Sequence, residues 1–267
     1  MLYEKGIHEL AVVHPDAKIG EGVSIGPYTF VGPHVEIGPN CVIHHHATIE
    51  GHTRIGKDNQ IFQYCSIGAP PQDLTYNNEP TRVEIGEANI FREFVSVHRG
   101  TTKENQVTTI GNNSLFMAYV HLGHDVVIGD KVVIANSCNL AGHVKLGDRA
   151  VLGGGCNISQ FVSIGRGAYL GGAAAIDRDI PLFCTAYGNR AKLKGINIIG
   201  LRRHGYSKTV VSEVVDFYRT MESSALSPRA FIDHEDLMSE YKGNEIIEEM
   251  ADGIRNTEVG VAPFLMS

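Results

Sequence analysis

The sequence of 267 residues contains no tryptophan, and only 7% of its residues are aromatic, a composition that does not suit a conventional globular core. Its five cysteines lack CxxC spacing, so neither a disulfide framework nor a zinc ribbon is indicated. The net charge of −7 argues against the cationic surface that nucleic-acid binding requires. No apolar run approaches the roughly 18 residues of a membrane span, and the N-terminus lacks the apolar core of a signal peptide. We therefore expect a cytoplasmic protein without nucleic-acid partners.

Glycine is abundant, with 30 residues, and an aliphatic residue recurs every six positions. The first run of this repeat comprises Ile7, Val13, Ile19, Ile25, Val31, Ile37, Ile43, Ile49, Ile55, Ile61 and Ile67. The repeat returns at Ile85, Phe91 and Val97, and after a second break it continues from Ile110 to Leu182. A sustained six-residue period predicts a parallel β-helix, in which three hexapeptides form one triangular coil and coils stack at about 4.8 Å.

A small or β-branched side chain stands two residues before most of the aliphatic ones, as Val23, Ala47 and Val126 illustrate. Both positions would point into the prism, whose narrow interior has room for one large side chain per face. Four of the five cysteines occupy the small position, namely Cys41, Cys65, Cys138 and Cys156. We therefore expect these cysteines to be buried small apolar residues and not reactive thiols.

The repeat is interrupted over residues 69–84 and 100–109, and loops ejected from a rigid scaffold commonly bind ligands. Beyond Leu182, helical signals predict helices over about 207–221, 228–241 and 244–256, with Ser207 and Ser227 as caps of the first two. We therefore predict a mainly β protein with a β-helix domain over 1–189, which carries both loops, and a small α-helical domain over 190–267. The apolar tail over 258–267 is expected to pack on a neighbour or to fray.

The segment from His121 to Asp125 departs from the repeat, and Gly142 and His143 follow about one coil later. A histidine oriented by a carboxylate suits general-base catalysis near neutral pH, and His124 directly precedes Asp125. The N–H of Gly142 could stabilise the oxyanion that forms when a thioester carbonyl is attacked. Because no serine or cysteine nucleophile stands beside these histidines, the pattern favours direct acyl transfer to a hydroxyl over an acyl-enzyme.

A cationic segment follows the last hexapeptide. It has no acidic residue and contains Arg190, Lys192, Lys194, Arg202, Arg203 and Lys208. In a chain of net charge −7, such a segment suits the phosphates of a nucleotide sugar or an acidic carrier protein, so Arg190 and Arg203 are candidate substrate-binding residues.

Two other classes of function stay open at this point. Carbonic anhydrases built on this type of helix bind a metal with three histidines, which His121, His124 and His143 could imitate. The helical region and the large acidic loop are not needed for so small a substrate. A non-catalytic hexapeptide subunit is the other class, and it has no need of His124 beside Asp125.

Six segments together resemble the UDP-N-acetylglucosamine O-acyltransferases, which catalyse the first step of lipid A synthesis. The segments are Pro71–Leu74, Glu79–Gly86, Val97–Thr101, His121–Asp125, Leu140–Val144 and Gly195–Arg203, and the similarity spans nearly the whole chain. The resemblance implies a left-handed parallel β-helix and a homotrimer with sites between subunits. It also implies transfer of an (R)-3-hydroxyacyl chain from acyl carrier protein to the 3-position of UDP-N-acetylglucosamine, with no metal or other cofactor.

The resemblance implies that His124 is the general base, that Asp125 orients it and that the Gly142 N–H forms the oxyanion hole. The other implied roles are contact with the sugar by Asp73, His121 and His143, and binding of the nucleotide by Asn197 and Arg203. Gln160 would position the phosphopantetheine arm, and Gly172 would leave room for a longer acyl chain.

Three positions depart from the family pattern. Thr75 stands where a lysine is usual, Ser159 where a histidine is usual, and Ile199 where a glutamate often contacts the nucleotide. One hypothesis is therefore that the acceptor is the 3-amino analogue of the nucleotide sugar, which would give an amide. A related N-acyltransferase of the same pathway usually adds an N-terminal uridine-binding domain, whereas the hexapeptides here begin by Ile7.

Overall fold

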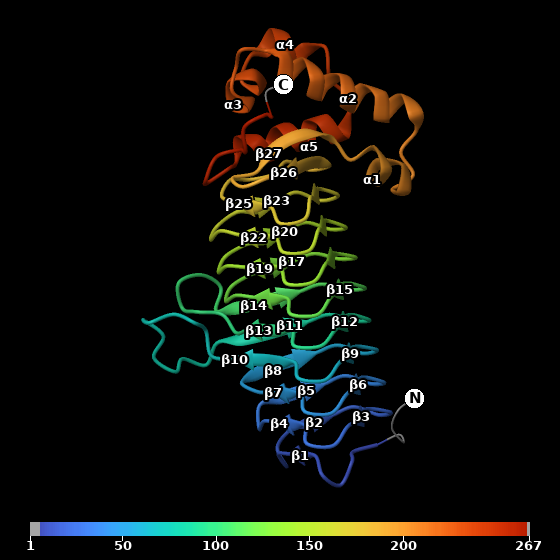
Figure 1. Cartoon of the computed structure of the whole chain (residues 1–267), viewed down its shortest axis with the longest axis vertical. Coiled ribbons are helices and arrows are strands. Elements are labelled where there is room, and N and C mark those ends of the chain that lie inside the picture. Colours follow the sequence, from blue (N-terminus) through green and yellow to red (C-terminus); the bar gives the residue numbers. More distant parts are fainter. Residues whose placement is uncertain (1–5, 266–267) are drawn as a thin grey trace.

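The computed structural model describes residues 6–265, which form a triangular prism of three β-sheets with helices stacked on one end (Figure 1). Sheet A contains β3 (Ser24–Ile25), β6 (Val42–Ile43), β9 (Gln60–Ile61), β12 (Ile90–Phe91), β15 (Leu115–Phe116), β18 (Val133–Ile134), β21 (Val151–Leu152), β24 (Tyr169–Leu170), β26 (Cys184–Tyr187) and β27 (Lys192–Ile196). Sheet B contains β1 (Val12–Val13), β4 (Phe30–Val31), β7 (Thr48–Ile49), β10 (Ser66–Ala69), β13 (Ser96–His98), β16 (His121–Leu122), β19 (Asn139–Leu140), β22 (Asn157–Ile158) and β25 (Ala175–Ile176). Sheet C contains β2 (Lys18–Ile19), β5 (Val35–Ile37), β8 (His52–Ile55), β11 (Arg82–Ile85), β14 (Val107–Ile110), β17 (Val127–Ile128), β20 (Lys145–Leu146) and β23 (Ser163–Ile164).

From β1 to β26, neighbouring strands within each sheet are parallel, and each pairs with the strand one coil onward. Leu122 pairs with Leu140, eighteen positions later, as three hexapeptides per coil require. Where a loop leaves the prism the separation grows, so that Ile67 pairs with Val97. Two loops leave the prism in this way, loop 1 (residues 70–81) and loop 2 (residues 99–106), and the coil geometry on either side of each stays intact. Both loops project from the same flank of the prism (Figure 1). The predicted mainly β parallel β-helix with a small helical region is confirmed.

The interior contains the repeated aliphatic residues and the small residues that precede them. Ile25 is 1% exposed, whereas Ile7 at the open N-terminal end is 51% exposed because no coil covers it. The five cysteines are buried and unpaired, so the prediction that four of them are small core residues is confirmed. Many corners hold a non-glycine residue in the left-handed region, among them Asp125 (φ 59°) and His143 (φ 65°). Such corners are costly for residues with a Cβ atom, and the stacked coils on both sides hold them in place.

A ladder of buried polar side chains joins successive coils at one corner. The Asn59 side-chain amide donates to the Gly86 carbonyl at 2.8 Å, and its oxygen accepts the Asn89 N–H at 2.9 Å. Asn89 repeats the pattern one coil onward, donating to the Gly111 carbonyl and accepting the Ser114 N–H. These amides satisfy backbone groups that the tight corner would otherwise leave buried without partners.

The C-terminal region contains α1 (Ile198–Arg203), α2 (Lys208–Ser223), α3 (Pro228–Ile232), α4 (Glu235–Ser239) and α5 (Glu245–Arg255). Ser207 and Ser227 cap α2 and α3 as predicted, and Asn244 caps α5 at the predicted start of the third helix. The prediction of one helix over 228–241 is wrong, because Asp233 ends α3 and His234 adopts an extended conformation before α4. Aspartate favours caps over helix interiors, and neither of these residues is a strong helix former. No helix among residues 6–265 is long and apolar enough to cross a membrane.

The junction between prism and helices is itself partly sheet. Strand β27 pairs with β26 in the only antiparallel register between strands described for residues 6–265, so residues 192–196 extend sheet A. The division into domains at 189/190 stays a prediction. In the tail, Val261 bridges to Asp179 and Phe264 to Leu193, so its described part packs on its own chain. The predicted tail residues 266 and 267 lie outside the described residues.

We predict that Asn89→Ala lowers the free energy of unfolding by about 2–4 kcal/mol, because it leaves the Gly111 carbonyl and the Ser114 N–H buried without their partner. Denaturant unfolding followed by circular dichroism measures the change. Asn105→Ala, in which an exposed loop 2 side chain is removed, is the matched control and should change stability by less than about 0.5 kcal/mol. Equal losses in the two variants would contradict a structural role for the ladder.

Candidate active site

The candidate site lies at the corner where sheet B turns into sheet C, immediately after β16. Leu122 of β16 points into the prism and is fully buried, so its neighbour His121 points outward. Gly123 then permits close packing on the next coil, because a Cβ atom there would lie 2.9 Å from the Gly142 nitrogen. The repeat thereby delivers His124 and Asp125 to an outer corner beside Gly142.

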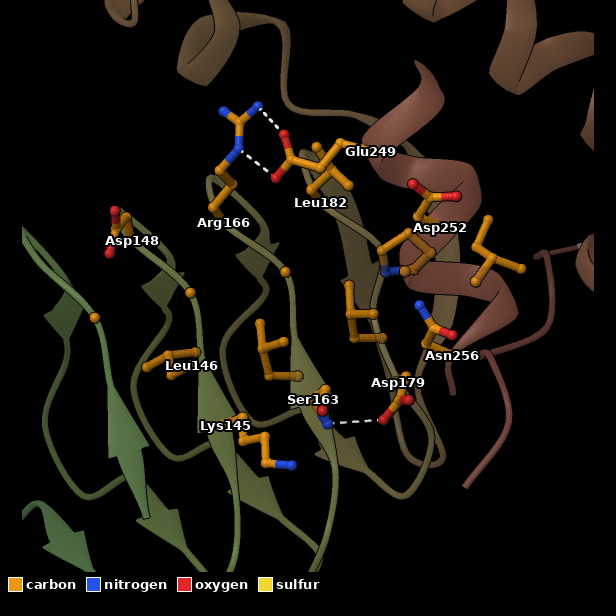
Figure 2. Close-up of a pocket in the computed structure, with 18 of the residues that line it drawn as sticks. Lys145, Leu146, Asp148, Ser163, Arg166, Asp179, Leu182, Glu249, Asp252 and Asn256 are labelled. Carbon is orange, nitrogen blue, oxygen red and sulfur yellow. Dashed lines mark hydrogen bonds and ion pairs between the residues drawn. The ribbon is translucent and has the colours of Figure 1, made fainter. Parts of the chain in front are cut away.

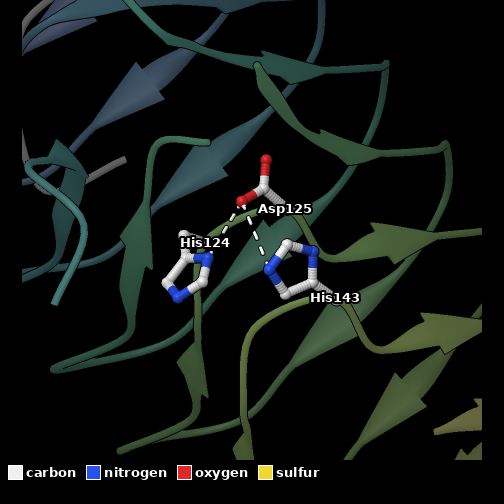
Figure 3. A group of neighbouring side chains, drawn as sticks. All are labelled: His124, Asp125 and His143. Carbon is white, nitrogen blue, oxygen red and sulfur yellow. Dashed lines mark hydrogen bonds and ion pairs between the residues drawn. The ribbon is translucent and has the colours of Figure 1, made fainter. Parts of the chain in front are cut away.

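His124 and Asp125 form a buried hydrogen-bonded pair, with 2.9 Å between Nδ1 and Oδ2 (Figure 3). Asp125 Oδ2 also accepts the Thr101 hydroxyl at 2.7 Å, and the Thr101 backbone N–H lies 3.0 Å from both carboxylate oxygens. Burial by itself raises the pKa of Asp125, but the hydrogen bonds from His124 and Thr101 outweigh it and hold that pKa below its ordinary value. Asp125 is therefore an anion at neutral pH that orients the His124 ring.

His143 lies one coil onward and is only 3% exposed. Its ring stands perpendicular to the His124 ring, at 5.0 Å between centroids, and stacks on Phe161 at 4.5 Å. Its Nε2 lies 3.9 Å from Asp125 Oδ2 (Figure 3), and its Nδ1 lies 3.2 Å from Glu104 Oε2 without the alignment of a hydrogen bond. His143 thus packs against the His124–Asp125 pair from the buried side.

Gly142 lies under the His124 ring. A Cβ atom on Gly142 would lie 2.4 Å from His124 Cε1 and 2.7 Å from Nε2, so only glycine allows the ring to lie here. Within residues 6–265 the Gly142 N–H donates no hydrogen bond, which leaves this donor available to a ligand. A backbone donor packed against a histidine base is the arrangement that oxyanion stabilisation needs.

A pocket of about 400 Å³ opens over these residues along sheet B. Its lining comprises Gln72, His98, His121, Gly123, His124, Asn139, Leu140, Ala141, Gly142, Asn157, Ile158, Ser159, Gln160 and Ala175. Of the predicted site residues, His121, His124, Gly142 and Gln160 therefore line one pocket. Asp125 and His143 lie buried behind it, while Gly172, at the turn between β24 and β25, is not among the lining residues.

Two further histidines in the pocket are held neutral. Burial and the neighbouring His121 and His124 lower the pKa of His98 to about 4. Burial, followed by His124, lowers the pKa of His121, whose Nδ1 lies 2.8 Å from the Ser96 hydroxyl. Both rings are therefore neutral hydrogen-bonding groups at pH 7. No role was predicted for His98 or Ser96, although Ser96 pairs with His121 across the parallel ladder.

Loop 2 supplies groups that the sequence did not predict. Thr101 holds Asp125, Glu104 faces His143, and the Lys103 ammonium lies 2.5 Å from Asp73 Oδ2 in loop 1. The hydrogen bond from Lys103, followed by those from Thr75, holds the pKa of Asp73 far below its usual range. The periodic pattern could not predict the positions of these residues, because a loop that leaves the prism has no fixed register.

The predicted nucleotide-binding residues lie elsewhere in the chain. Asn197 and Arg203 line a pocket of about 510 Å³ on sheet A, together with Lys131, Arg149 and Tyr169. The Asn197 side chain also caps α1 by accepting the Gly200 N–H at 2.9 Å. The cationic lining suits phosphates, and Lys131 and Arg149 were not predicted. Arg190 lies outside this pocket, with its side chain 85% exposed and 3.5 Å from Asp177.

A further pocket, of about 660 Å³ and so larger than the one at the histidines, lies between sheet C and α5 (Figure 2). Leu146, Ile164 and Leu182 form part of its apolar wall. At its rim, Arg166 on the prism and Glu249 on α5 form a two-pronged ion pair (Figure 2). The ion pair ties α5 to the prism, so the pocket belongs to the junction between prism and helices.

The donor atoms of His124, Asp125 and His143 lie within 4.8 Å of one another and could by type hold a metal ion. This group differs from the three histidines of the alternative carbonic anhydrase hypothesis, because His121 lies outside it and Asp125 takes its place. Asp125 Oδ2 already accepts hydrogen bonds from Thr101 and His124, so a metal would have to compete with both donors.

Comparison with known proteins gives a consistent result. Residues 179–262 match the family model described as "Udp N-acetylglucosamine O-acyltransferase; Domain 2", and residues 16–51 and 108–142 match the bacterial transferase hexapeptide model. The chain is 49% identical to the acyl-[acyl-carrier-protein]–UDP-N-acetylglucosamine O-acyltransferase of Burkholderia vietnamiensis, covering 83% of this chain and 84% of that protein. It is 44% identical to the protein of the same name from Halorhodospira halophila, covering 96% and 98%.

Among solved structures, LpxA from Acinetobacter baumannii superposes with a TM-score of 0.92 at 39% identity, covering 96% of this chain and 99% of that one. This agreement confirms the predicted fold class, a left-handed parallel β-helix followed by a small helical region. The chain belongs to the acyl-[acyl-carrier-protein]–UDP-N-acetylglucosamine O-acyltransferase family.

Proposed function

We propose that this protein transfers an (R)-3-hydroxyacyl chain from acyl carrier protein to the 3-position of UDP-N-acetylglucosamine, the first step of lipid A synthesis, in the cytoplasm. The observation that carries the proposal is the buried His124–Asp125 pair, packed on Gly142 in the wall of a pocket. The names of relatives at 44–49% identity supply the donor and acceptor classes.

In the proposed mechanism, Asp125 occupies Nδ1 of His124 and leaves Nε2 as the basic nitrogen. Nε2 removes the proton of the sugar 3-hydroxyl while the oxygen attacks the thioester carbonyl of the donor. The Gly142 N–H stabilises the oxyanion of the tetrahedral intermediate. Collapse of the intermediate breaks the carbon–sulfur bond, and the imidazolium returns the proton to the departing thiol. The ester and the free phosphopantetheine thiol are the products.

The remaining site residues hold the substrates. His121 and Gln160 line the pocket, and we propose that they contact the sugar and the phosphopantetheine arm, respectively. Asp73, which directly follows the lining residue Gln72, binds the sugar from loop 1. His143 lies buried behind the pocket and packs against the His124–Asp125 pair, so it acts on the base and not on the sugar. Gly172 leaves room for a longer acyl chain. We propose that no metal or other cofactor takes part, since His124 and Gly142 together supply a base and an oxyanion donor.

We propose a homotrimer with sites between subunits. His124 lies at the corner of sheets B and C, while the cationic pocket with Asn197 and Arg203 lies on sheet A of the same chain. Sheet A of a neighbouring copy would bring the nucleotide-binding groups to His124. Exposed aromatic side chains along one corner of the prism, including Tyr64 and Tyr119, supply apolar area for such packing.

We predict that His124→Ala lowers kcat/KM for acyl transfer by about 10²–10⁴-fold, the usual contribution of a general base. The assay follows transfer from 3-hydroxyacyl-acyl carrier protein to UDP-N-acetylglucosamine. His234→Ala is the matched control, because His234 precedes α4 without a capping hydrogen bond from its side chain. Activity that survives in His124→Ala would assign the base elsewhere.

The same assay tests the substrate and the cofactor proposals. Wild-type protein that makes no ester would overturn the proposed function, and faster reaction with the 3-amino acceptor would favour the amide product. Activity that persists after chelation supports the metal-free mechanism, and loss that zinc restores would contradict it.

We predict that Gly142→Ala lowers kcat at least about tenfold, because the new methyl group would overlap the His124 ring and displace the base. Gly253→Ala is the control, since no atom lies within 4 Å of a Cβ atom at that position in α5. Steady-state kinetics with both variants gives the comparison. A Gly142→Ala variant with unchanged kcat would contradict the placement of the ring over Gly142.

We predict that Thr101→Val raises the pKa of the Asp125 carboxyl, because burial already opposes the charged form and the variant removes one of the hydrogen bonds that stabilise it. An NMR titration of the Asp125 carboxyl carbon measures the change. Thr102→Val, at the exposed neighbouring residue, is the control and should leave this pKa in place. A pKa that falls in Thr101→Val, or that moves equally in both variants, would refute a stabilising role for the Thr101 hydroxyl.

A further inference from the structure

The two loops ejected from the prism meet at one ion pair. The Lys103 ammonium in loop 2 lies 2.5 Å from Oδ2 of Asp73 in loop 1. Asp73 directly follows Gln72, which lines the pocket over His124. The ion pair therefore joins the two loops at the edge of the pocket.

Both oxygens of Asp73 are held in place. Oδ1 accepts the Thr75 backbone N–H and the Thr75 hydroxyl, each at 2.8 Å, while Lys103 is the one donor to Oδ2 among the described residues. A carboxylate oxygen can accept about two hydrogen bonds, so the three donors fix the orientation of the group and leave acceptor capacity on Oδ2 for a ligand hydroxyl. An oriented carboxylate with one remaining acceptor position is suited to a sugar.

Lys103 is also joined to the catalytic pair. Its backbone N–H lies 3.4 Å from the Thr101 hydroxyl oxygen, and that hydroxyl donates to Asp125. Residues 101–103 therefore form a short, continuous connection between the carboxylates of Asp125 and Asp73. Loop 2 thus sets the position of Asp73 relative to His124.

Loop 1 has a separate anchor that does not involve Lys103. Arg99 donates to the Gly68 carbonyl at 2.8 Å and to the Tyr76 hydroxyl at 3.0 Å, which ties the middle of the loop to the strand that precedes it. The Lys103 side chain is half exposed. Removal of Lys103 therefore frees Oδ2 of Asp73, and with it one of the two constraints on the carboxylate, without removing the contacts that fold the loop.

We propose that Lys103 is a positioning residue for the acceptor sugar, acting through Asp73. The inference rests on the proposed function, which places Asp73 against the sugar. The lysine that the family pattern has at position 75 is absent from this chain, and the ammonium beside Asp73 comes from loop 2 instead.

The first test is steady-state kinetics of Lys103→Ala. Because Asp73 binds the sugar equally before and during reaction, the KM for the nucleotide sugar should rise about five- to tenfold, while kcat changes less than about threefold and the KM for the acyl donor stays constant. Lys57→Ala is the matched control, since Lys57 is an exposed lysine paired with Glu87 at 3.5 Å in the N-terminal half of the prism. The wild-type KM should also rise with salt, and that rise should be smaller in Lys103→Ala.

The second test moves the charge within the site. Thr75→Lys in the Lys103→Ala background should restore the KM to within about threefold of wild type, because position 75 already contacts the same carboxylate. Lys103→Arg should retain most of the affinity. In an Asp73→Asn background, Lys103→Ala should add little, since its effect passes through Asp73.

Three outcomes overturn the inference: an unchanged acceptor KM in Lys103→Ala, a loss confined to kcat, or a full additional loss on top of Asp73→Asn. Each of these requires an active wild-type enzyme. An inactive wild type instead refutes the proposed function, so failure of the function and failure of this inference give different results.

Discussion

The backbone hydrogen bonds that join each coil to the next are the interaction on which the molecule depends. They run between residues about eighteen positions apart, and they hold corners such as Asp125 and His143 at positive φ although both carry a Cβ atom. A corner in this conformation turns its side chain toward the neighbouring coil. His124, Asp125 and His143 therefore meet because of the same stacking that builds the prism, and the site needs no separate framework.

The chemistry of the site depends on one buried anion. Desolvation of Asp125 opposes its charge, and the donors from His124 and Thr101, followed by the neighbouring His143, make the charged form favourable. Thr101 belongs to loop 2, whereas Asp125 belongs to the prism. A segment outside the repeat therefore supplies hydrogen bonds that stabilise the anion beside the proposed base. The neutral His98 and His121 add hydrogen-bonding capacity without adding positive charge beside His124.

Periodicity makes part of this arrangement predictable. A six-residue period converts a separation of eighteen residues into spatial contact, which is why Gly142 and His143 can be placed next to His124 from the amino-acid order alone. Loop 2 obeys no period, so Thr101, Lys103 and Glu104 cannot be placed in the same way. The helical region was predicted well at Ser207 and Ser227, whose capping side chains are local signals. It was predicted poorly at Asp233 and His234, which end α3 and precede α4 inside the single helix predicted over 228–241. In the proposed trimer, groups on sheet A face a neighbouring copy. No pattern in the sequence of one chain indicates that these groups lie near His124 of that copy.

The coil length also restricts how such a chain can change in size during evolution. An insertion of one residue in a strand would move the side chains that follow in that strand from one face to the other, because successive side chains along a strand alternate between the two faces. An insertion of a whole coil would lengthen the prism and preserve the pairing. Loops 1 and 2 are the exceptions, since they add residues between strands whose pairing is maintained on both sides. Tolerated length variation should therefore occur in whole coils or in these two loops. New binding groups can be added in the loops with the least disturbance of the fold.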